Sequence, residues 1–189
     1  VLNIMKKTKG KFFIRIILLL ALLGASYYYH KQIIRYSYKA WRFHKRFFHK
    51  QGAYSNQVEF PFGYSVYGID VSRWQDEINW AKLKTKTLDD DTIKFEFAFI
   101  KATEGIFIED PMFRDNWEDS KKNKVVRGAY HYFLVNYEPK LQAKNFSASV
   151  KLSKGDLPPA IDVEETGGKS KAELVKRVKI FIAEIEKRY

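Results

Sequence analysis

Two acidic residues stand two positions apart at the end of a short apolar segment, Pro159-Ala-Ile-Asp-Val-Glu164. In a β-strand, residues i and i+2 lie on the same face, so Asp162 and Glu164 are expected to project together. Asp70 lies near the end of a second apolar segment, residues 66–71. If both segments are parallel strands of one sheet, the three carboxylates meet at its carboxyl end, where α/β folds place their ligand sites.

Converging carboxylates repel one another, and this repulsion raises the pKa of at least one of them. A protonated acid beside an ionised one is the pair that cleavage of a glycosidic bond requires. Two other roles stay open, because three carboxylates can hold Mg²⁺ or Ca²⁺ and acids that follow strands often cap the next helix. No Gly-rich phosphate loop follows any expected strand, so a bound metal would have no nucleotide to act on.

His131 is the single histidine of residues 66–189. By residue type, Ser72 could complete a Ser–His–Asp set with it. The sequence around Ser72 does not resemble a nucleophile elbow, however. We therefore interpret His131 as a hydrogen-bonded structural residue of a strand.

Residues 66–189 alternate between strand-like and helix-like patterns. Asp110 and Pro111 are expected to be the N-cap and the first residue of a helix. A capping box, Ser170-x-x-Glu173, is expected to open the last helix, whose apolar residues repeat at helical spacing. The expected strands are residues 66–71, 95–100, 125–133 and 159–164, and the expected helices cover residues 78–84, the segment after Asp110 through Trp117, residues 139–150 and the segment from Leu174 to Ile185.

This alternation, with mostly apolar strands, indicates a parallel sheet with covered faces. We predict an α/β fold, a parallel β/α barrel of irregular TIM type. A complete barrel takes about 250 residues. Residues 66–189 are therefore expected to hold only about the first four β/α units, and an open doubly wound sheet of four strands is the alternative.

The net charge of +12 is concentrated near the N-terminus. Residues 1–65 contain 12 Lys and Arg against the single acid Glu59, whereas residues 66–189 contain 22 basic and 21 acidic residues. A nearly neutral domain argues against nucleic-acid binding. The absence of cysteine excludes disulfides, thiolate nucleophiles and Cys-ligated metals.

An apolar segment, residues 12–29, follows a basic N-terminal region, residues 1–11. Its length is about the minimum for crossing a hydrocarbon core, and it ends in three tyrosines, which are typical of membrane interfaces. We expect an uncleaved transmembrane signal anchor, with cleavage near Ser26 as the alternative. Residues 30–65 are expected to form a basic, aromatic stem and a linker. The stem could lie on anionic headgroups or on a polyanionic wall, and a solvated linker helix is the alternative.

Nine short blocks, in order along the chain, resemble glycoside hydrolase family 25, the muramidase type of lysozyme. They run in family order from about Val66 toward the chain end, and their combination is specific although no single block is. The blocks are Gly68-Ile-Asp-Val-Ser72, Trp74-Gln75, Ile78-Asn-Trp80, Phe99-Ile-Lys-Ala-Thr-Glu-Gly105, Asp110-Pro-x-Phe113, Asn116-Trp117, Arg127-Gly-Ala-Tyr-His131, Gln142-Ala-x-Asn-Phe146 and Gly155-Asp-Leu-Pro-Pro-Ala-Ile-Asp-Val-Glu164.

The resemblance implies hydrolysis of the β-1,4 bond between N-acetylmuramic acid and N-acetylglucosamine in peptidoglycan, with no metal or cofactor. It implies that Glu164 is the general acid. Asp162 would support the reacting centre or orient the substrate acetamido group, and Asp70 would be the acid of the first strand. Tyr130 and Lys101 fall in family motifs near the groove and are expected to contact substrate.

With the expected anchor, the resemblance predicts a membrane-tethered lysozyme whose incomplete catalytic domain, residues 66–189, faces the cell wall or periplasm. Its partners would be peptidoglycan and the membrane, and no nucleic acid. A non-catalytic peptidoglycan-binding module on the same fold is the alternative. A chitinase-like glycosidase would usually carry a further Asp two residues before the Asp-x-Glu pair, where this chain has Ala160.

Overall fold

The computed structural model describes residues 2–48, 66–83, 86–88, 91–93 and 95–189. The chain divides into two compact units, residues 1–49 and 50–189. Residues 49–65, which contain the expected linker, lie outside the described residues.

The first unit is one helix, α1 (Leu2–Phe48). From Phe13 to Trp41 this helix is long and apolar enough to cross a membrane, with a mean hydropathy of 1.4. The leucine and isoleucine side chains of this stretch are exposed rather than packed against other residues. The predicted apolar segment thus lies within α1, and the helix continues into the predicted stem.

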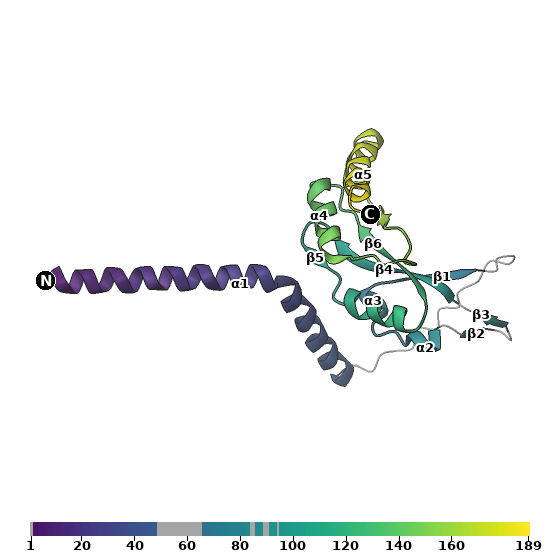
Figure 1. The fold of residues 1–189 in the computed structure, drawn as a ribbon, viewed down its shortest axis with the longest axis horizontal. Coiled ribbons are helices and arrows are strands. Elements are labelled where there is room, and N and C mark those ends of the chain that lie inside the picture. Colours follow the sequence, from purple (N-terminus) through teal and green to yellow (C-terminus); the bar gives the residue numbers. More distant parts are fainter. Residues whose placement is uncertain (1, 49–65, 84–85, 89–90, 94) are drawn as a thin grey trace. The chain divides into compact units, whose positions relative to one another are not determined.

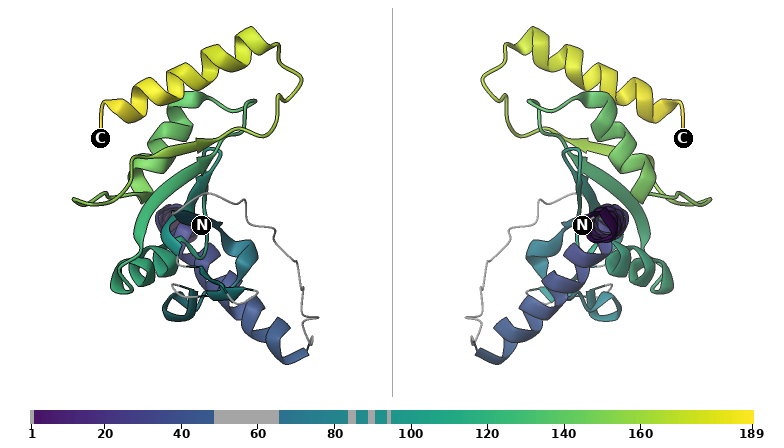
Figure 2. Two further views of the ribbon diagram at one scale, coloured as in Figure 1. Left: turned by 90° about the vertical axis from the view of Figure 1, so that its right-hand side faces the viewer. Right: turned by 90° about the vertical axis from the view of Figure 1, so that its left-hand side faces the viewer.

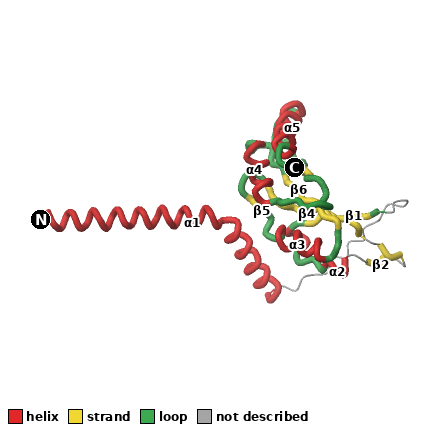
Figure 3. The backbone as a smooth tube through the Cα atoms, in the orientation of Figure 1, coloured by secondary structure: helices red, strands yellow, loops and turns green. Residues whose placement is uncertain are grey.

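The second unit contains a curled sheet whose main strands are parallel (Figures 1 and 3). The strand order follows the chain order without a reversal. A doubly wound sheet requires such a reversal, so the open alternative does not describe this sheet, which has the form of a half-barrel. In order, the strands are β1 (Tyr67–Val71), β4 (Phe95–Glu104), β6 (Val126–Tyr132) and β7 (Ala160–Asp162), with β5 (Ile108–Glu109) antiparallel to β4 and a separate antiparallel pair, β2 (Lys86–Leu88) and β3 (Asp91–Ile93).

Helices pack on the outer face of the sheet and on each other (Figure 2). α3 contacts β4 and β6, and α4 contacts both β4 and α5. The last helix begins after Ser170 as predicted, because the Ser170 hydroxyl accepts a hydrogen bond from the Glu173 amide at 3.3 Å. The short helix η1 (Arg73–Gln75) follows β1, and the α-helices of this unit are α2 (Trp80–Leu83), α3 (Phe113–Lys122), α4 (Pro139–Ser149) and α5 (Lys171–Glu186).

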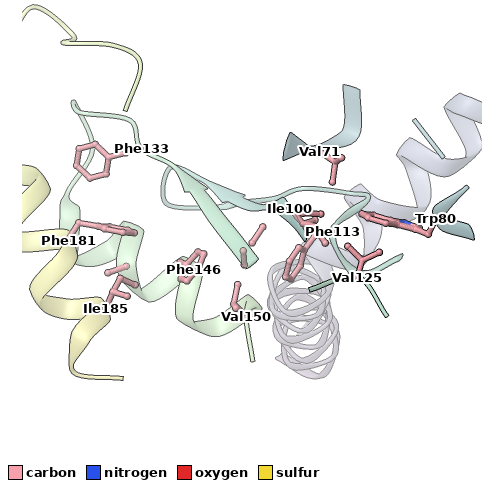
Figure 4. Close-up of a cluster of buried hydrophobic side chains, with 14 of the residues drawn as sticks. Val71, Trp80, Ile100, Phe113, Val125, Phe133, Phe146, Val150, Phe181 and Ile185 are labelled. Carbon is pink, nitrogen blue, oxygen red and sulfur yellow. The ribbon is translucent and has the colours of Figure 1, made fainter. Parts of the chain in front are cut away.

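The hydrophobic core lies between the sheet and these helices (Figure 4). Alanines of β4 and β6 keep the outer face of the sheet flat, so large side chains from the helices can approach it. Phe113, Phe146 and Phe181 each leave 3% or less of their surface exposed. Burial of one such aromatic side chain contributes about 2–3 kcal/mol, so the core fixes the sheet on which the site is built.

The opposite, inner face of the sheet carries large aromatic rings over glycines. A Cβ atom on Gly68 would lie 2.2 Å from the Phe97 ring, and one on Gly128 would lie 2.5 Å from the Phe99 ring. Both glycines are therefore required by close approach of a side chain. The two phenylalanines line an apolar groove together with Leu157 and its neighbours.

The predicted start of the helix after Asp110 is wrong. α3 begins at Phe113, and Met112 rather than Asp110 is its N-cap. The Asp110 carboxylate accepts hydrogen bonds from the amides of Arg73 at 3.1 Å and Met112 at 2.9 Å. Because its side chain joins η1 to the turn before α3, Asp110 closes that turn instead of capping the helix, and Pro111 lies within the turn.

Candidate active site

The pairing of the strands brings the predicted site residues onto the inner face of the sheet. In the register of the parallel strands, Lys101 lies opposite Tyr130, and Tyr132 lies opposite Asp162. Asp70, one residue before the end of β1, lies opposite Phe99 of β4. The site is thus built at the carboxyl ends of neighbouring strands, where loops leave space for a ligand.

A bulge in β4 brings two charged side chains together. Residues three apart in a regular strand point to opposite faces. The pairing of β4 with β6 shifts between Lys101 and Thr103, so the residue between them is an extra, unpaired residue of β4. This bulge returns Glu104 to the face of Lys101. The Lys101 ammonium donates to Glu104 Oε2 at 2.7 Å, and Lys101 is almost completely buried.

Asp70 lies beside a tyrosine of β6. The Tyr130 hydroxyl is close enough to the Asp70 carboxylate to lower its pKa as a donor. Partial desolvation raises the pKa of Asp70, and the negative charge of Glu164 raises it further, while Tyr130 and Lys101 oppose the shift. Burial and the charge of Asp70 together raise the pKa of Tyr130 far above its usual value, so this hydroxyl stays a donor.

Asp162 ends β7 and is partly buried. Desolvation is the largest cause of its raised pKa, and the charges of Glu164 and Asp70 are the next. Lys101 lowers the pKa of Asp162 by its positive charge. The structure therefore brings Asp70, Asp162 and Glu164 within electrostatic reach of one another, with one buried cation beside them.

Glu164 lies two residues beyond the end of β7 and is exposed to solvent. The Tyr132 hydroxyl donates a hydrogen bond to Glu164 Oε2 at 3.3 Å. On the other side of this contact, the Lys101 ammonium lies 4.4 Å from the centroid of the Tyr132 ring. Tyr132 is not among the site residues predicted from the sequence, although period-two alternation places it on the face of Tyr130 once the direction of β6 is known.

Asp110 and η1 border this group of side chains. Burial raises the pKa of Asp110, while the two backbone amides that it accepts from and the charges of Arg73 and Lys101 lower it. Ser72 forms a capping box with Gln75 at the start of η1. The exposed indole of Trp74 stands beside the Arg73 guanidinium, 4.9 Å from its ring centroid.

His131 lies on the outer face of β6, away from the carboxylates of the site. It is fully buried, its Nδ1 lies 2.7 Å from Thr103 Oγ1, and its Nε2 lies 3.1 Å from Gln142 Oε1. Burial lowers its pKa to about 4, which keeps the ring neutral. The structural interpretation of His131 is therefore correct, and the Ser72 hydroxyl contacts Gln75 within the capping box of η1.

The described residues include no group of three or more His, Cys, Asp or Glu side chains placed to hold a metal ion. Of the site carboxylates, Glu164 accepts a hydrogen bond from the Tyr132 hydroxyl, and Asp70 has the Tyr130 hydroxyl beside it. A weakly acidic hydroxyl that donates to a carboxylate leaves that carboxylate free to exchange a proton with a ligand. This arrangement suits acid–base chemistry.

Comparison with known proteins finds relatives that extend beyond this chain. Over 184 residues, it is 39% identical to the "Uncharacterized protein YegX" of Escherichia coli O6:H1, covering 96% of this chain and 67% of that protein. It is 34% identical to "Lysozyme M1" of Streptomyces globisporus over 103 residues, which are 52% of this chain and 33% of that protein. This chain thus spans about a third to two thirds of the length of these two relatives.

A solved structure shows the same fold. The family 25 glycosyl hydrolase of Bacillus anthracis superposes with a TM-score of 0.63 at 31% identity, covering 73% of this chain and 63% of that one. Residues 69–189, which include every site residue described above, match the model of the family described as "Glycosyl hydrolases family 25". The chain therefore belongs to glycosyl hydrolase family 25.

Proposed function

We propose that this chain is a membrane-tethered N-acetylmuramidase, a lysozyme that hydrolyses the β-1,4 bond between N-acetylmuramic acid and N-acetylglucosamine in peptidoglycan. The observation that carries the proposal is the convergence of Asp70, Asp162 and Glu164 at the carboxyl ends of parallel strands in a family 25 fold. Glycoside hydrolysis needs two carboxyl groups in different protonation states at one bond. Relatives named as lysozymes or muramidases support the choice of substrate.

In this proposal, Glu164 is the general acid. It is exposed at the rim of the sheet, where a glycosidic oxygen can reach it. Asp162 supports the positive charge that develops at the sugar ring, or orients the acetamido group of the substrate. Lys101 favours the ionised form of Asp162, because its ammonium lowers the pKa of that carboxyl.

Asp70 completes the carboxylate group from the first strand. The Tyr130 hydroxyl beside it lowers its pKa and so favours its ionised form. Tyr130 and Lys101 are proposed as substrate contacts, since both lie among the carboxylates and both are hydrogen-bond donors. No metal or cofactor takes part in the proposed reaction.

The proposed catalytic domain is residues 66–189, as part of an irregular TIM-type barrel. The four parallel strands would then be the first four of that barrel, in the order expected for a barrel. The coverage of 63% of the Bacillus anthracis chain is consistent with a longer catalytic fold. Glycine–aromatic packing on the inner face also fits the filled interior of a small barrel.

We further propose that residues 12–29 of α1 are the signal anchor, with the domain on the cell-wall or periplasmic side. The exposed apolar side chains of this helix support insertion into a bilayer. The alternative is a secreted enzyme cleaved near Ser26. Alkaline extraction of membranes from expressing cells, with mass measurement of the product, separates the two: a tethered protein stays in the pellet at full mass, whereas a cleaved one is released and shorter.

Release of reducing ends from purified peptidoglycan tests the catalytic proposal. We expect the full chain to release sugar, and Glu164→Gln to reduce the rate by at least about 100-fold, as loss of a general acid does. The matched control is Glu165→Gln, which removes the charge of the exposed neighbouring residue and should keep full activity. Equal activity of Glu164→Gln and the wild type would overturn the proposal. Sedimentation with sacculi without sugar release would favour the non-catalytic wall-binding module, and release from chitin rather than peptidoglycan would favour a chitinase.

A further inference from the structure

Glu164 needs support from outside its own strand. β7 contains only three residues and ends at Asp162, so Glu164 projects from an exposed segment beyond the backbone pairing of the sheet. A carboxyl group that transfers a proton must be held within about 0.5 Å of its productive position. The residue that contacts the Glu164 carboxylate in the structure is Tyr132, at 3.3 Å.

Tyr132 is itself held from two sides. Its backbone belongs to β6, which pairs with β7 on one side and with β4 on the other. Its ring lies under the Lys101 ammonium, 4.4 Å from the ring centroid, and this ammonium is fixed by its 2.7 Å bond to Glu104. A cation over an aromatic face restricts the ring and leaves the hydroxyl in the plane free to donate.

We propose that Tyr132 is a positioning residue that orients the Glu164 carboxyl for proton transfer, and that the Lys101–Glu104 pair fixes the Tyr132 ring for this purpose. The inference rests on the proposed function, because it concerns the same carboxyl group. Tyr132 donates to one oxygen of Glu164 and so keeps that oxygen an acceptor in both protonation states. The exchangeable proton is therefore carried by the other oxygen.

The same hydrogen bond assists the reaction as it proceeds. When Glu164 gives its proton to the leaving oxygen, the carboxylate gains negative charge. A hydrogen bond to a charged acceptor is about twice as strong as one to a neutral acceptor. The contact with Tyr132 thus strengthens as the charge develops, without any movement of the ring.

The charges around Tyr132 agree with a hydroxyl that stays protonated. Desolvation raises its pKa, and the nearby carboxylates of Glu164, Glu165 and Asp162 raise it further. Tyr132 is therefore a donor throughout the pH range in which carboxyl groups titrate. A phenylalanine at this position would keep the ring under Lys101 and remove only the donor.

The first test compares the full-length variants Tyr132→Phe and Tyr189→Phe with the wild type on purified peptidoglycan. The Tyr189 hydroxyl also donates a hydrogen bond, to the Val150 carbonyl at 2.8 Å. Tyr189→Phe is therefore the matched control, because it also removes one tyrosine hydroxyl that donates a hydrogen bond. We expect Tyr132→Phe to lower kcat about tenfold, with KM changed less than about twofold. Tyr189→Phe should change neither. Unchanged kcat in Tyr132→Phe would overturn the inference.

The second test does not depend on activity. The full chain in detergent micelles is labelled with ¹³C at the carboxyl carbons of glutamate, and the Glu164 signal is assigned by its loss in Glu164→Gln. At pH 7 we expect this signal to move in Tyr132→Phe and to stay in place in Tyr189→Phe. If the Glu164 signal does not move in Tyr132→Phe, the inference is overturned. This outcome can be read even if the protein hydrolyses no peptidoglycan.

The results distinguish a failure of the proposed function from a failure of the positioning role alone. If Glu164→Gln hydrolyses peptidoglycan as well as the wild type does, the proposed function fails and the positioning role fails with it. If Glu164→Gln is inactive while Tyr132→Phe matches the wild type in kcat and carbon signal, only the positioning role fails.

Discussion

The buried histidine of β6 makes the fold sensitive to acid. His131 has no exposed surface, and its ring stacks on the Phe181 ring with 4.9 Å between the ring centroids. Its two ring nitrogens form hydrogen bonds with Thr103 and Gln142. Gln142 also donates from its amide nitrogen to the Leu134 and Tyr137 carbonyls, so its oxygen is turned toward His131 and the Leu134 amide. The ring is thus neutral, with its proton on Nε2 and Nδ1 accepting from Thr103.

The size of the effect follows from the pKa of His131. Its pKa is about 4 in the folded chain and 6.5 as an ordinary value. As the pH falls below 6.5, His131 takes up a proton in the unfolded chain but not in the folded chain, so the free energy of unfolding decreases. The decrease stops near pH 4, where the folded chain also protonates His131. At about 1.36 kcal/mol per pKa unit, the loss is roughly 3 kcal/mol.

Urea unfolding of the full chain in detergent, followed by tryptophan fluorescence from pH 7 to pH 4, measures this loss. Three aspartates with raised pKa values, Asp70, Asp110 and Asp162, act in the opposite sense, because the folded chain protonates them at higher pH than the unfolded chain does. They are the same in a His131→Gln variant. The difference between the wild-type and variant curves therefore isolates His131.

We expect His131→Gln to be less stable than the wild type at pH 7, and the gap to close by roughly 3 kcal/mol toward pH 4. His131→Asn serves as a second variant in case the glutamine is too long for the site. Two parallel stability curves across this range would refute the assignment of a neutral, buried imidazole.

Three further outcomes follow from side-chain contacts. Gly128→Ala should cost about 1–3 kcal/mol, because its Cβ would lie 2.5 Å from the Phe99 ring; a thermal melt checks this, and an unchanged Tm would contradict the packing. Arg127→Met should cost about 3 kcal/mol, since it leaves the buried Asp156 without its partner at 2.8 Å, and adding Asp156→Leu should recover most of the loss in urea unfolding. Lys101→Met should raise the pKa of Asp70 and Asp162, because the Lys101 ammonium lowers both. The acidic limb of the pH profile of kcat/KM on peptidoglycan should therefore move to higher pH. An unmoved limb would show that neither aspartate limits the rate.

The main strands and helices could be predicted from the sequence because their patterns are local. Apolar and β-branched segments gave each parallel strand, and Ser170 gave the start of the last helix. The turn at Asp110 could not be predicted in this way, because its carboxylate is occupied by the amide of Arg73, 37 residues earlier. The β2–β3 pair was also missed, since the polar segment from Lys86 to Ile93 lacks the alternation that marks a strand.

The candidate site was predictable in its acids and less so in its supporting residues. Alternation predicts that Asp162 and Glu164 project together, and Asp70 follows from its place near a strand end. The structure brings the charges of Asp162 and Glu164 within reach of each other, although β7 ends at Asp162. The contact between Lys101 and Glu104 depends on a bulge, and a bulge exists only relative to the partner strand. No periodicity within β4 alone could reveal that residues three apart share one face.

Strand β6 connects the core to the site through the same alternation. His131 faces the helices, while Tyr130 and Tyr132 on either side of it face the carboxylates. Because neighbouring side chains of a strand share one backbone, the hydrogen bonds that lock His131 also fix the two tyrosines. In the proposed positioning role, Tyr132 therefore contacts the exposed acid Glu164 from a strand whose opposite face is held by the hydrogen-bond network of His131. Changes to that network should disturb the site without touching any residue in it.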